Sequence, residues 1–158
     1  MKKLLTNIGK KSKKAFSHQI NTKKKDKVLK DYCRLIKQNK HLIINENKKD
    51  IKNAYKKKIK YNLIQRLILD DKKILDIIQS INKIIKLKDP TNIVLEKWKR
   101  PNGLNISKVS IPIGVIGVIY ESRPSVTSDV SALCFKSGNS VILKGGSEAY
   151  YSNLLISK

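Results

Sequence analysis

A change in the spacing of apolar residues limits the fold of this chain more than any other feature. Residues 114–120 read GVIGVIY and residues 140–144 read SVILK, two apolar runs that lack polar alternation. Such runs are typical of strands that are covered on both faces. Residues 125–136 lie between them, follow a helical pattern and end at Gly138-Asn139. Strand, helix and strand joined by short loops predict a βαβ unit with parallel strands and a right-handed crossover.

The first part of the chain shows helical spacing instead. Amphipathic helices are expected over residues 26–38, 41–58 and 70–87, with a short further helix before the last of them. Asp70 and Asp71 favour the start of the last helix through its dipole, and Asp89-Pro90 ends it. The side chains expected to face inward are Val28, Tyr32, Leu35, Ile36, Ile44, Ile51, Tyr55, Leu63, Leu67, Ile68, Ile74, Ile77, Ile78, Ile81, Ile84 and Ile85.

A β-hairpin is expected between these two regions. Residues 93–98 and 104–111 are extended in pattern, and Asn102-Gly103 between them suits a tight turn. We therefore expect an α/β chain of three parts. The parts are a helical region over residues 1–90, a hairpin arm over residues 91–111 and a βαβα unit over residues 112–158. A sheet of two such strands leaves an edge and apolar surface uncovered, so the unit is expected to be incomplete.

The formal net charge of +23 lies almost entirely in the first hundred residues, which hold 30 Lys and Arg against 9 Asp and Glu. A basic region of this kind is typical of proteins that bind nucleic acid or anionic membranes. Lysine, isoleucine and asparagine, whose codons are all A/T-rich, make up 67 of the 158 residues. The lysines are spread along helix faces without interleaved aromatic residues, so we favour compositional drift over nucleic-acid binding.

Cysteine and hydropathy patterns limit the compartment and the kinds of site. Cys33 and Cys134 lack a Cys-x-x-Cys pair and a companion histidine, which predicts reduced thiols in a cytoplasmic protein and no metal site. The basic N-terminus has a single short apolar run, Leu4-Leu5, so no signal peptide is expected. The longest uncharged stretch, residues 109–120, is too short and too broken by Pro and Gly to span a membrane.

Residues 144–149, KGGSEA, form a glycine-rich segment directly after the second strand. Gly145 and Gly146 allow a ligand to approach the backbone, Ser147 can cap the next helix, and Lys144 can pair with a ribose phosphate. The carboxyl ends of strands are where open α/β sheets bind ligands. An ordinary strand–turn–helix connection with a capping serine explains these residues equally well, and GVIG is not the G-x-G-x-x-G fingerprint.

Residues 120–127, YESRPSVT, follow the first strand and are expected at the same edge of the sheet. Arg123 precedes a proline and is held out of helical geometry, so its guanidinium can project from the loop and hold a phosphate or carboxylate. A surface ion pair with Glu121 explains this arginine as well.

These motifs together resemble one enzyme family. Residues 111–124, 131–149 and Ser152-Asn153 closely resemble the corresponding region of the gamma-glutamyl phosphate reductases, members of the aldehyde dehydrogenase superfamily. A looser resemblance upstream, through residues 43–54, 63–70 and 87–92, extends it over nearly the whole chain. It implies N-terminal helices, a hairpin arm and the first βαβ unit of a truncated, Rossmann-like nucleotide-binding domain.

The resemblance implies an NADPH-dependent reductase of proline biosynthesis that converts L-glutamate 5-phosphate to L-glutamate 5-semialdehyde and phosphate. In such enzymes a cysteine thiolate attacks the acyl phosphate, and a hydride reduces the thioester. This cysteine lies beyond residue 158, so no catalytic residue is expected in this chain. By position, Arg123 and Ser125 are expected on the substrate side. The residues expected on the adenosine side of NADPH are Lys144, Gly145, Gly146, Ser147 and Glu148.

Two departures from the family pattern affect these expectations. Ser125 stands where the family usually has Asn, and Lys144 stands where it often has Arg.

The 158 residues alone are expected to have no turnover, and the arm is expected to pair with a C-terminal strand in a complete homo-oligomer. Two alternatives stay open: a lysine-rich module that binds nucleic acid or an anionic surface, and a fragment that complements a separate catalytic half.

Overall fold

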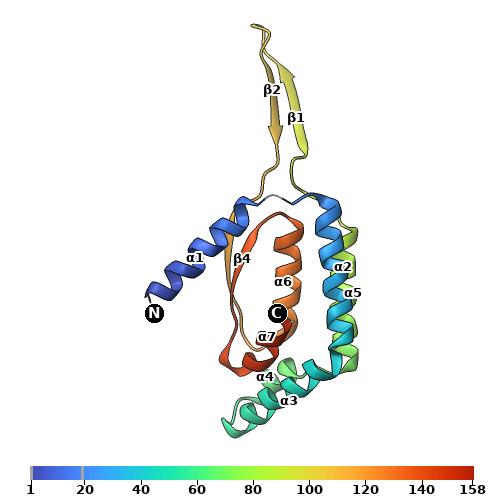
Figure 1. The fold of residues 1–158 in the computed structure, drawn as a ribbon, viewed down its shortest axis with the longest axis vertical. Helices are drawn as coiled ribbons and strands as arrows, with labels where there is room; N and C mark the ends of the chain where they lie inside the picture. Colours follow the sequence, from blue (N-terminus) through green and yellow to red (C-terminus); the bar gives the residue numbers. More distant parts are fainter. Residues whose placement is uncertain (1, 19) are drawn as a thin grey trace.

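The structure is a computed structural model that describes residues 2–18 and 20–158. Met1 and Gln19, both within the helical region expected over residues 1–90, lie outside the described residues. Helices form the N-terminal part of the chain, and two small sheets follow them in sequence (Figure 1). The elements are α1 (Lys2–Ser17), α2 (Thr22–Gln38), α3 (Lys40–Lys56), α4 (Tyr61–Leu67), α5 (Asp71–Lys86), β1 (Val94–Lys99), β2 (Asn105–Val109), β3 (Val115–Ile119), α6 (Pro124–Lys136), β4 (Ser140–Lys144), the 3-10 turn η1 (Ser147–Ala149) and α7 (Tyr150–Ile156).

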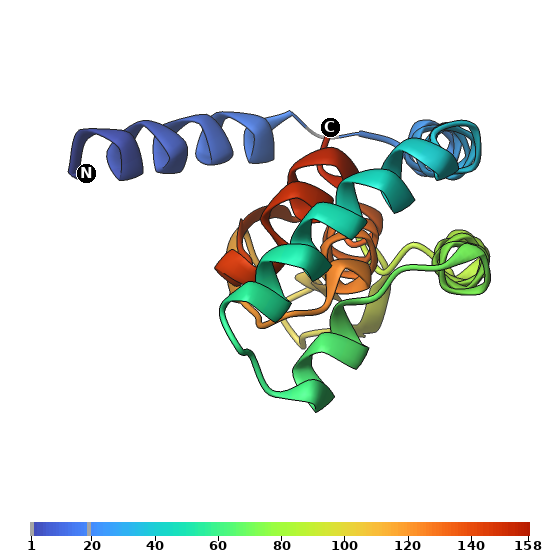
Figure 2. The ribbon, with the colours of Figure 1, turned by 90° about the horizontal axis from the view of Figure 1, so that it is seen from below.

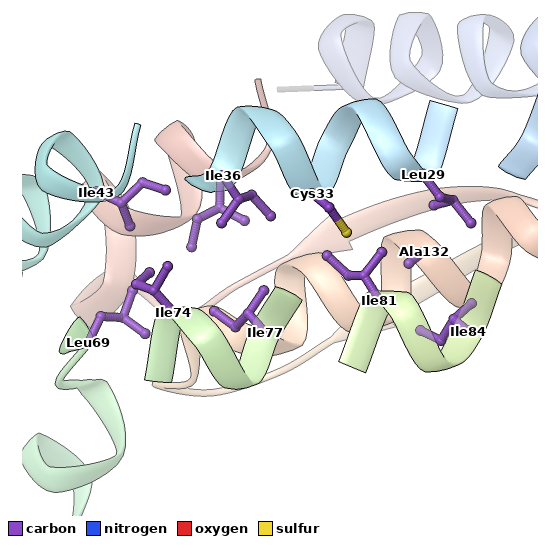
Figure 3. Close-up of a cluster of buried hydrophobic side chains, with 11 residues drawn as sticks. Leu29, Cys33, Ile36, Ile43, Leu69, Ile74, Ile77, Ile81, Ile84 and Ala132 are labelled. Atoms are coloured by element: carbon purple, nitrogen blue, oxygen red, sulfur yellow. The ribbon is translucent and has the colours of Figure 1, made fainter. Parts of the chain in front are cut away.

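The main core lies among α2, α5 and α6. Figure 2 shows α2 and α5 end on with α6 beside them, and the helices pack against one another. Ile74 and Ile81 of α5 are completely buried, and Ile77 and Ile84 are nearly so. Figure 3 shows these side chains directed toward α2, with Ala132 of α6 against the same cluster. The apolar face predicted for α5 is therefore confirmed.

The inward face of α2 differs from the sequence prediction. Val28 and Leu35, expected inside, are 49% and 48% exposed. The buried residues of the helix are Lys25, Leu29, Cys33 and Ile36. The inward stripe is displaced because it includes a lysine, whose charge is buried against the Asp89 carboxylate and the carbonyl of Lys136.

The inward face of α3 was also predicted wrongly. Tyr55, expected inside, is 56% exposed, and Asn47 and Asp50 are buried instead. The Asn47 amide donates to the carbonyl of Leu67 at 2.9 Å and accepts the backbone N–H of Leu69 at 2.8 Å. Polar residues face inward here because side chains of α3 provide hydrogen-bond partners for the backbone N–H and carbonyl groups at the end of α4 and just after it.

The predicted hairpin arm is present and projects from the body of the molecule (Figure 1). β1 pairs antiparallel with β2, and Gly103 supplies the positive φ of the turn, +86°. Every residue of β1 is exposed. The arm therefore gains its order from the ladder between its strands.

The predicted parallel pair is confirmed, since β3 and β4 pair in register from Val115–Ser140 to Ile119–Lys144 with α6 as the crossover. α1 packs against both strands; it lies within the helical region predicted over residues 1–90, although no separate helix was predicted before residue 26. The expected two-sided cover is missing in the described residues, because Val115 and Ile119 of β3 are 39% and 86% exposed. The prediction of an incomplete sheet agrees with this exposure.

Two buried lysines join the helices to the base of the arm. Lys25 donates to the Asp89 carboxylate at 2.8 Å and to the carbonyl of Lys136 at 3.2 Å. Lys136 in turn donates to Asp26 and to the carbonyl of Ile85. Because each ammonium has both a carboxylate and a carbonyl, burial of its charge is compensated.

Replacing Ile81 by Ala is expected to lower the free energy of unfolding by about 2–5 kcal/mol, because it opens a cavity in a completely buried site. Leu75 of the same helix is 51% exposed, so Leu75→Ala is the matched control. It should change the free energy of unfolding by about 0.5 kcal/mol or less. Urea unfolding followed by circular dichroism measures both. Equal effects of the two changes would contradict the assignment of the core.

Asp89 gives the stability a defined pH dependence. Burial opposes the charged form, but hydrogen bonds from Lys25, Thr91 and Thr22 outweigh it and hold the pKa of Asp89 well below its ordinary value. A depressed folded-state pKa stabilises the fold above the unfolded pKa of about 3.9, and this contribution is lost as the pH falls further.

We therefore expect Asp89→Asn to destabilise the chain near neutral pH, and the difference from wild type to narrow as the pH falls from about 4 toward 2. Urea midpoints over a pH series measure this. Asp31→Asn, at an exposed carboxylate paired with Arg34, should have little effect at any pH. A difference for Asp89→Asn that does not change with pH would count against the buried ion pair.

Candidate functional site

Two polar turns meet at one edge of the parallel sheet. The arginine turn, residues 120–125, follows β3, and the glycine turn, residues 144–149, follows β4. The backbone N–H of Tyr120 donates to the carbonyl of Lys144 at 3.1 Å, which continues the ladder beyond β3. A Cβ added to Gly146 would lie 3.7 Å from the Cα of Glu121. The structure therefore brings together the two motifs that the sequence predicts at one edge.

Arg123 has the geometry that its following proline predicts. Its backbone is extended, with φ −135° and ψ 92°, and its side chain is exposed. In the part of the chain that the structure describes, its guanidinium makes no ion pair, so the alternative pairing with Glu121 is absent. Ser125 follows in the first turn of α6 and is half-buried. Both residues line one cavity of about 380 Å³.

The glycine turn is packed from the inside by polar side chains. A Cβ on Gly145 would overlap the amide of Asn153 and lie 3.1 Å from the ring of Tyr120. The Tyr120 hydroxyl lies 2.6 Å from that of Thr127, which donates to the amide oxygen of Asn153 at 2.9 Å. Gly145 is therefore required by packing, while Lys144 stays exposed at the edge with its ammonium 3.4 Å from the carbonyl of Gly145.

Ser147 does not cap the next helix, contrary to the sequence prediction. Its hydroxyl donates to the Glu148 carboxylate at 3.3 Å. The backbone N–H groups of Tyr151 and Ser152 at the start of α7 instead donate to Asp50 of α3, at 3.1 Å and 2.8 Å. A carboxylate from a helix distant in sequence therefore supplies the cap, since Ser147 lies exposed at the start of η1, one 3-10 turn before α7 begins.

Sequence reasoning missed the structural role of Asn47 and Asp50. Both are buried, and both bond to Ser152, the Asp50 carboxylate at 2.7 Å and the Asn47 amide at 3.0 Å. Figure 2 shows α3 crossing over the C-terminal segment that these bonds hold. The available signal was the spacing of two polar residues one turn apart on the face that carries Ile43 and Ala54.

Neither cysteine of the chain is suited to nucleophilic attack. Cys33 and Cys134 are free and buried, and burial raises the pKa of both thiols. A raised pKa keeps a thiol protonated, whereas the thiolate is the nucleophile. Within the described residues no group of three or more His, Cys, Asp or Glu side chains could hold a metal ion. None of the helices in that part of the chain combines the length and apolarity needed to cross a membrane.

Comparison with known proteins identifies the class. The gamma-glutamyl phosphate reductase of Nautilia profundicola is 53% identical over 137 residues, which make up 87% of this chain and 33% of the relative. That of Thermodesulfovibrio yellowstonii is 44% identical over 160 residues, covering 100% of this chain and 38% of the relative. No family model matches the chain.

Solved structures agree with these relatives. A crystal structure of gamma-glutamyl phosphate reductase from Thermotoga maritima superimposes with a TM-score of 0.93 at 38% identity, over 96% of this chain and 37% of that one. The structure of the Saccharomyces cerevisiae enzyme gives 0.90 at 33% identity, over 95% and 39%.

The helices, the parallel pair and the two turns at its edge define an α/β chain that matches the N-terminal part of the gamma-glutamyl phosphate reductase structures. The chain belongs to the gamma-glutamyl phosphate reductase family. It spans about a third of the length of the curated relatives that it matches.

Gly145→Ala is expected to destabilise the chain by about 1–3 kcal/mol, because the new methyl group overlaps Asn153 and crowds Tyr120. Gly117→Ala in β3 is the control, since a Cβ there meets nothing within 4 Å. Denaturant unfolding measures both changes. Combining Gly145→Ala with Asn153→Ala should recover part of the loss, and strictly additive effects would contradict the contact.

Proposed function

We propose that this chain forms part of the cofactor and substrate site of an enzyme that reduces L-glutamate 5-phosphate in proline biosynthesis. NADPH and a proton would be consumed, and L-glutamate 5-semialdehyde, NADP⁺ and phosphate released. One observation carries the proposal: the arginine turn and the glycine turn, which match the family, lie side by side through the bond between Tyr120 and Lys144. Strand ends of open parallel sheets are the usual place for such ligands.

The glycine turn is proposed to hold the adenosine side of NADPH, which supplies the hydride when bound. Lys144 fits an anionic group because, among the described residues, its exposed ammonium donates to the carbonyl of Gly145 alone. An ammonium at this place favours a ribose phosphate, so it supports NADPH over NADH. The other proposed contacts come from Gly145, Gly146, Ser147 and Glu148, whose half-buried or exposed backbone lies at the sheet edge.

The arginine turn is proposed to bind the substrate. Arg123 is free to pair with an anion, and Ser125 offers a hydroxyl from the adjoining turn of α6. Neither residue can replace a nucleophile. Cys33 and Cys134 are both buried, so neither is proposed as the nucleophile, and the chain alone is proposed to have no turnover.

The hairpin arm is proposed to serve assembly. Its apolar side chains are exposed, with Leu95, Trp98 and Leu104 between 43% and 57% accessible. Apolar strands with free edges are suited to pairing with a further strand, so we propose that the arm helps to form a homo-oligomer of the complete enzyme. We also propose that the complete enzyme is cytoplasmic, which agrees with the free thiols of Cys33 and Cys134.

The test joins this chain to the remaining part of the Nautilia profundicola relative and follows NADPH oxidation with L-glutamate 5-phosphate. We expect the joined protein to be active and the isolated chain to be inactive. Arg123→Ala should lower kcat/KM by about 100-fold, which corresponds to the loss of a charge-assisted hydrogen bond.

Arg100→Ala, at the turn of the arm, is the matched control and should leave kcat/KM unchanged. An inactive joined protein that is folded and binds NADPH would contradict the proposed substrate. Full activity of Arg123→Ala would contradict the role of the arginine turn.

A further inference from the structure

A buried hydroxyl group connects the two turns of the candidate site from inside the molecule. Thr127 lies near the start of α6 and is 1% exposed. Its hydroxyl oxygen lies 2.6 Å from the hydroxyl of Tyr120, the first residue of the arginine turn. The same hydroxyl donates to the amide oxygen of Asn153 in α7 at 2.9 Å. We call these three side chains the Thr127 bridge.

The direction of the two hydrogen bonds follows from the number of hydrogen atoms. A threonine hydroxyl has one hydrogen, which Thr127 gives to Asn153. The Tyr120 hydroxyl therefore donates to Thr127. Without the Thr127 hydroxyl, Tyr120 would lose its acceptor and Asn153 would lose its donor, and an unpaired polar group in a protein interior is unfavourable.

The outer members of the Thr127 bridge also determine where the glycine turn can lie. A Cβ at Gly145 would overlap the amide of Asn153 and lie 3.1 Å from the ring of Tyr120. The backbone of the glycine turn therefore packs directly on both side chains. Since Tyr120 is also the start of the arginine turn, a displaced Tyr120 would disturb both turns together.

The strands themselves are held without the Thr127 bridge. The ladder between β3 and β4 ends at the pair Ile119–Lys144 and consists of backbone bonds. The bridge lies beyond this end and joins side chains of the turn after β3, of α6 and of α7. Loss of the Thr127 hydroxyl is therefore expected to leave the sheet in place and to loosen the two turns.

We propose that Thr127 is a positioning residue of the candidate site: its hydroxyl fixes the arginine turn relative to the glycine turn. The assignment rests on the proposed function and deepens it, because a buried side chain that contacts neither ligand then sets the affinity for both. The two turns are proposed to hold parts of the ligands that do not react. Loss of the hydroxyl should therefore weaken binding and leave the chemical step nearly unchanged.

The first experiment measures steady-state kinetics of the joined protein. Thr127→Val removes the hydroxyl at similar side-chain volume. We expect it to raise the KM for NADPH and the KM for L-glutamate 5-phosphate about tenfold each, while kcat stays within about threefold of wild type. Thr127→Ser keeps a hydroxyl and should return both KM values to within about threefold of wild type.

Thr91→Val is the matched control for a lost hydroxyl. The Thr91 hydroxyl donates to the Asp89 carboxylate at 2.7 Å, at the base of the arm and outside both turns. This change also removes a hydroxyl from a network that holds the fold, so it reproduces a purely structural effect. It should leave both KM values unchanged.

The second experiment needs no ligand and uses the 158-residue chain. The backbone N–H groups of Arg123 and Ala149 are hydrogen-bonded within the two turns, to the carbonyls of Glu121 and Gly146. Thr127→Val should speed hydrogen exchange at these two amides at least about tenfold and leave exchange along the β3–β4 ladder unchanged, because only the turns open more often. Thr91→Val should not change exchange at either turn.

Three results would overturn the inference: unchanged KM values in Thr127→Val, equal increases in Thr91→Val, or no recovery in Thr127→Ser. A joined protein that reduces L-glutamate 5-phosphate with both KM values unaffected by Thr127→Val would contradict this inference alone. A joined protein without reductase activity would contradict the proposed function. Hydrogen exchange then decides the inference, which fails if both turns of Thr127→Val exchange as in wild type.

Discussion

Parallel strands end on the same side of their sheet, and the register of β3 against β4 sets which residues meet there. Pairing Ile119 with Lys144 places the backbone of Tyr120 against the carbonyl of Lys144, so that the arginine turn and the glycine turn start at the same height. A shift of one residue would turn every side chain to the other face. The candidate site and the Asn153 network both depend on this register.

The helices around the sheet hold this edge through polar contacts as much as through apolar packing. The carboxylate of Asp50 accepts the first free N–H groups of α7, and Lys25 and Lys136 join α2, α5 and α6 to the base of the arm. Each of these groups is buried and has a partner, so each specifies one arrangement of the elements. Several sit in sequence motifs shared with the family, which gives those motifs a structural explanation.

Most of the fold follows from the spacing of apolar residues. The isoleucines of α5, the Asp70 cap that accepts the N–H of Lys73 at 2.7 Å, and the two strands all obey local rules that depend on neighbouring residues. The wrongly predicted inward faces of α2 and α3 do not follow local rules, because Lys25 and Asp50 are buried through partners that include residues 64 and 102 positions away in the sequence. Periodicity cannot reveal such partners, and it treats a buried lysine as an exposed one.

The site was predictable to a similar degree. The meeting of the two turns follows from parallel strand order, whereas the capping of α7 by Asp50 depends on how α3 packs and was not predicted from the sequence. The ligand contacts assigned to Arg123, Ser125 and the residues from Lys144 to Glu148 stay predictions, since they concern molecules that the fold alone does not specify.

The uncovered sheet also affects how these residues behave in solution. Ile111 and Ile113 before β3 and Ile119 at its end expose most of their surface, which favours association between molecules. The net charge of +23 opposes that association by mutual repulsion, whatever the origin of the lysines. Added salt screens such repulsion beyond about 10 Å at 0.1 M, while the apolar attraction persists. Raising the ionic strength is therefore expected to lower the solubility of the chain, because it weakens the repulsion and leaves the apolar attraction unchanged.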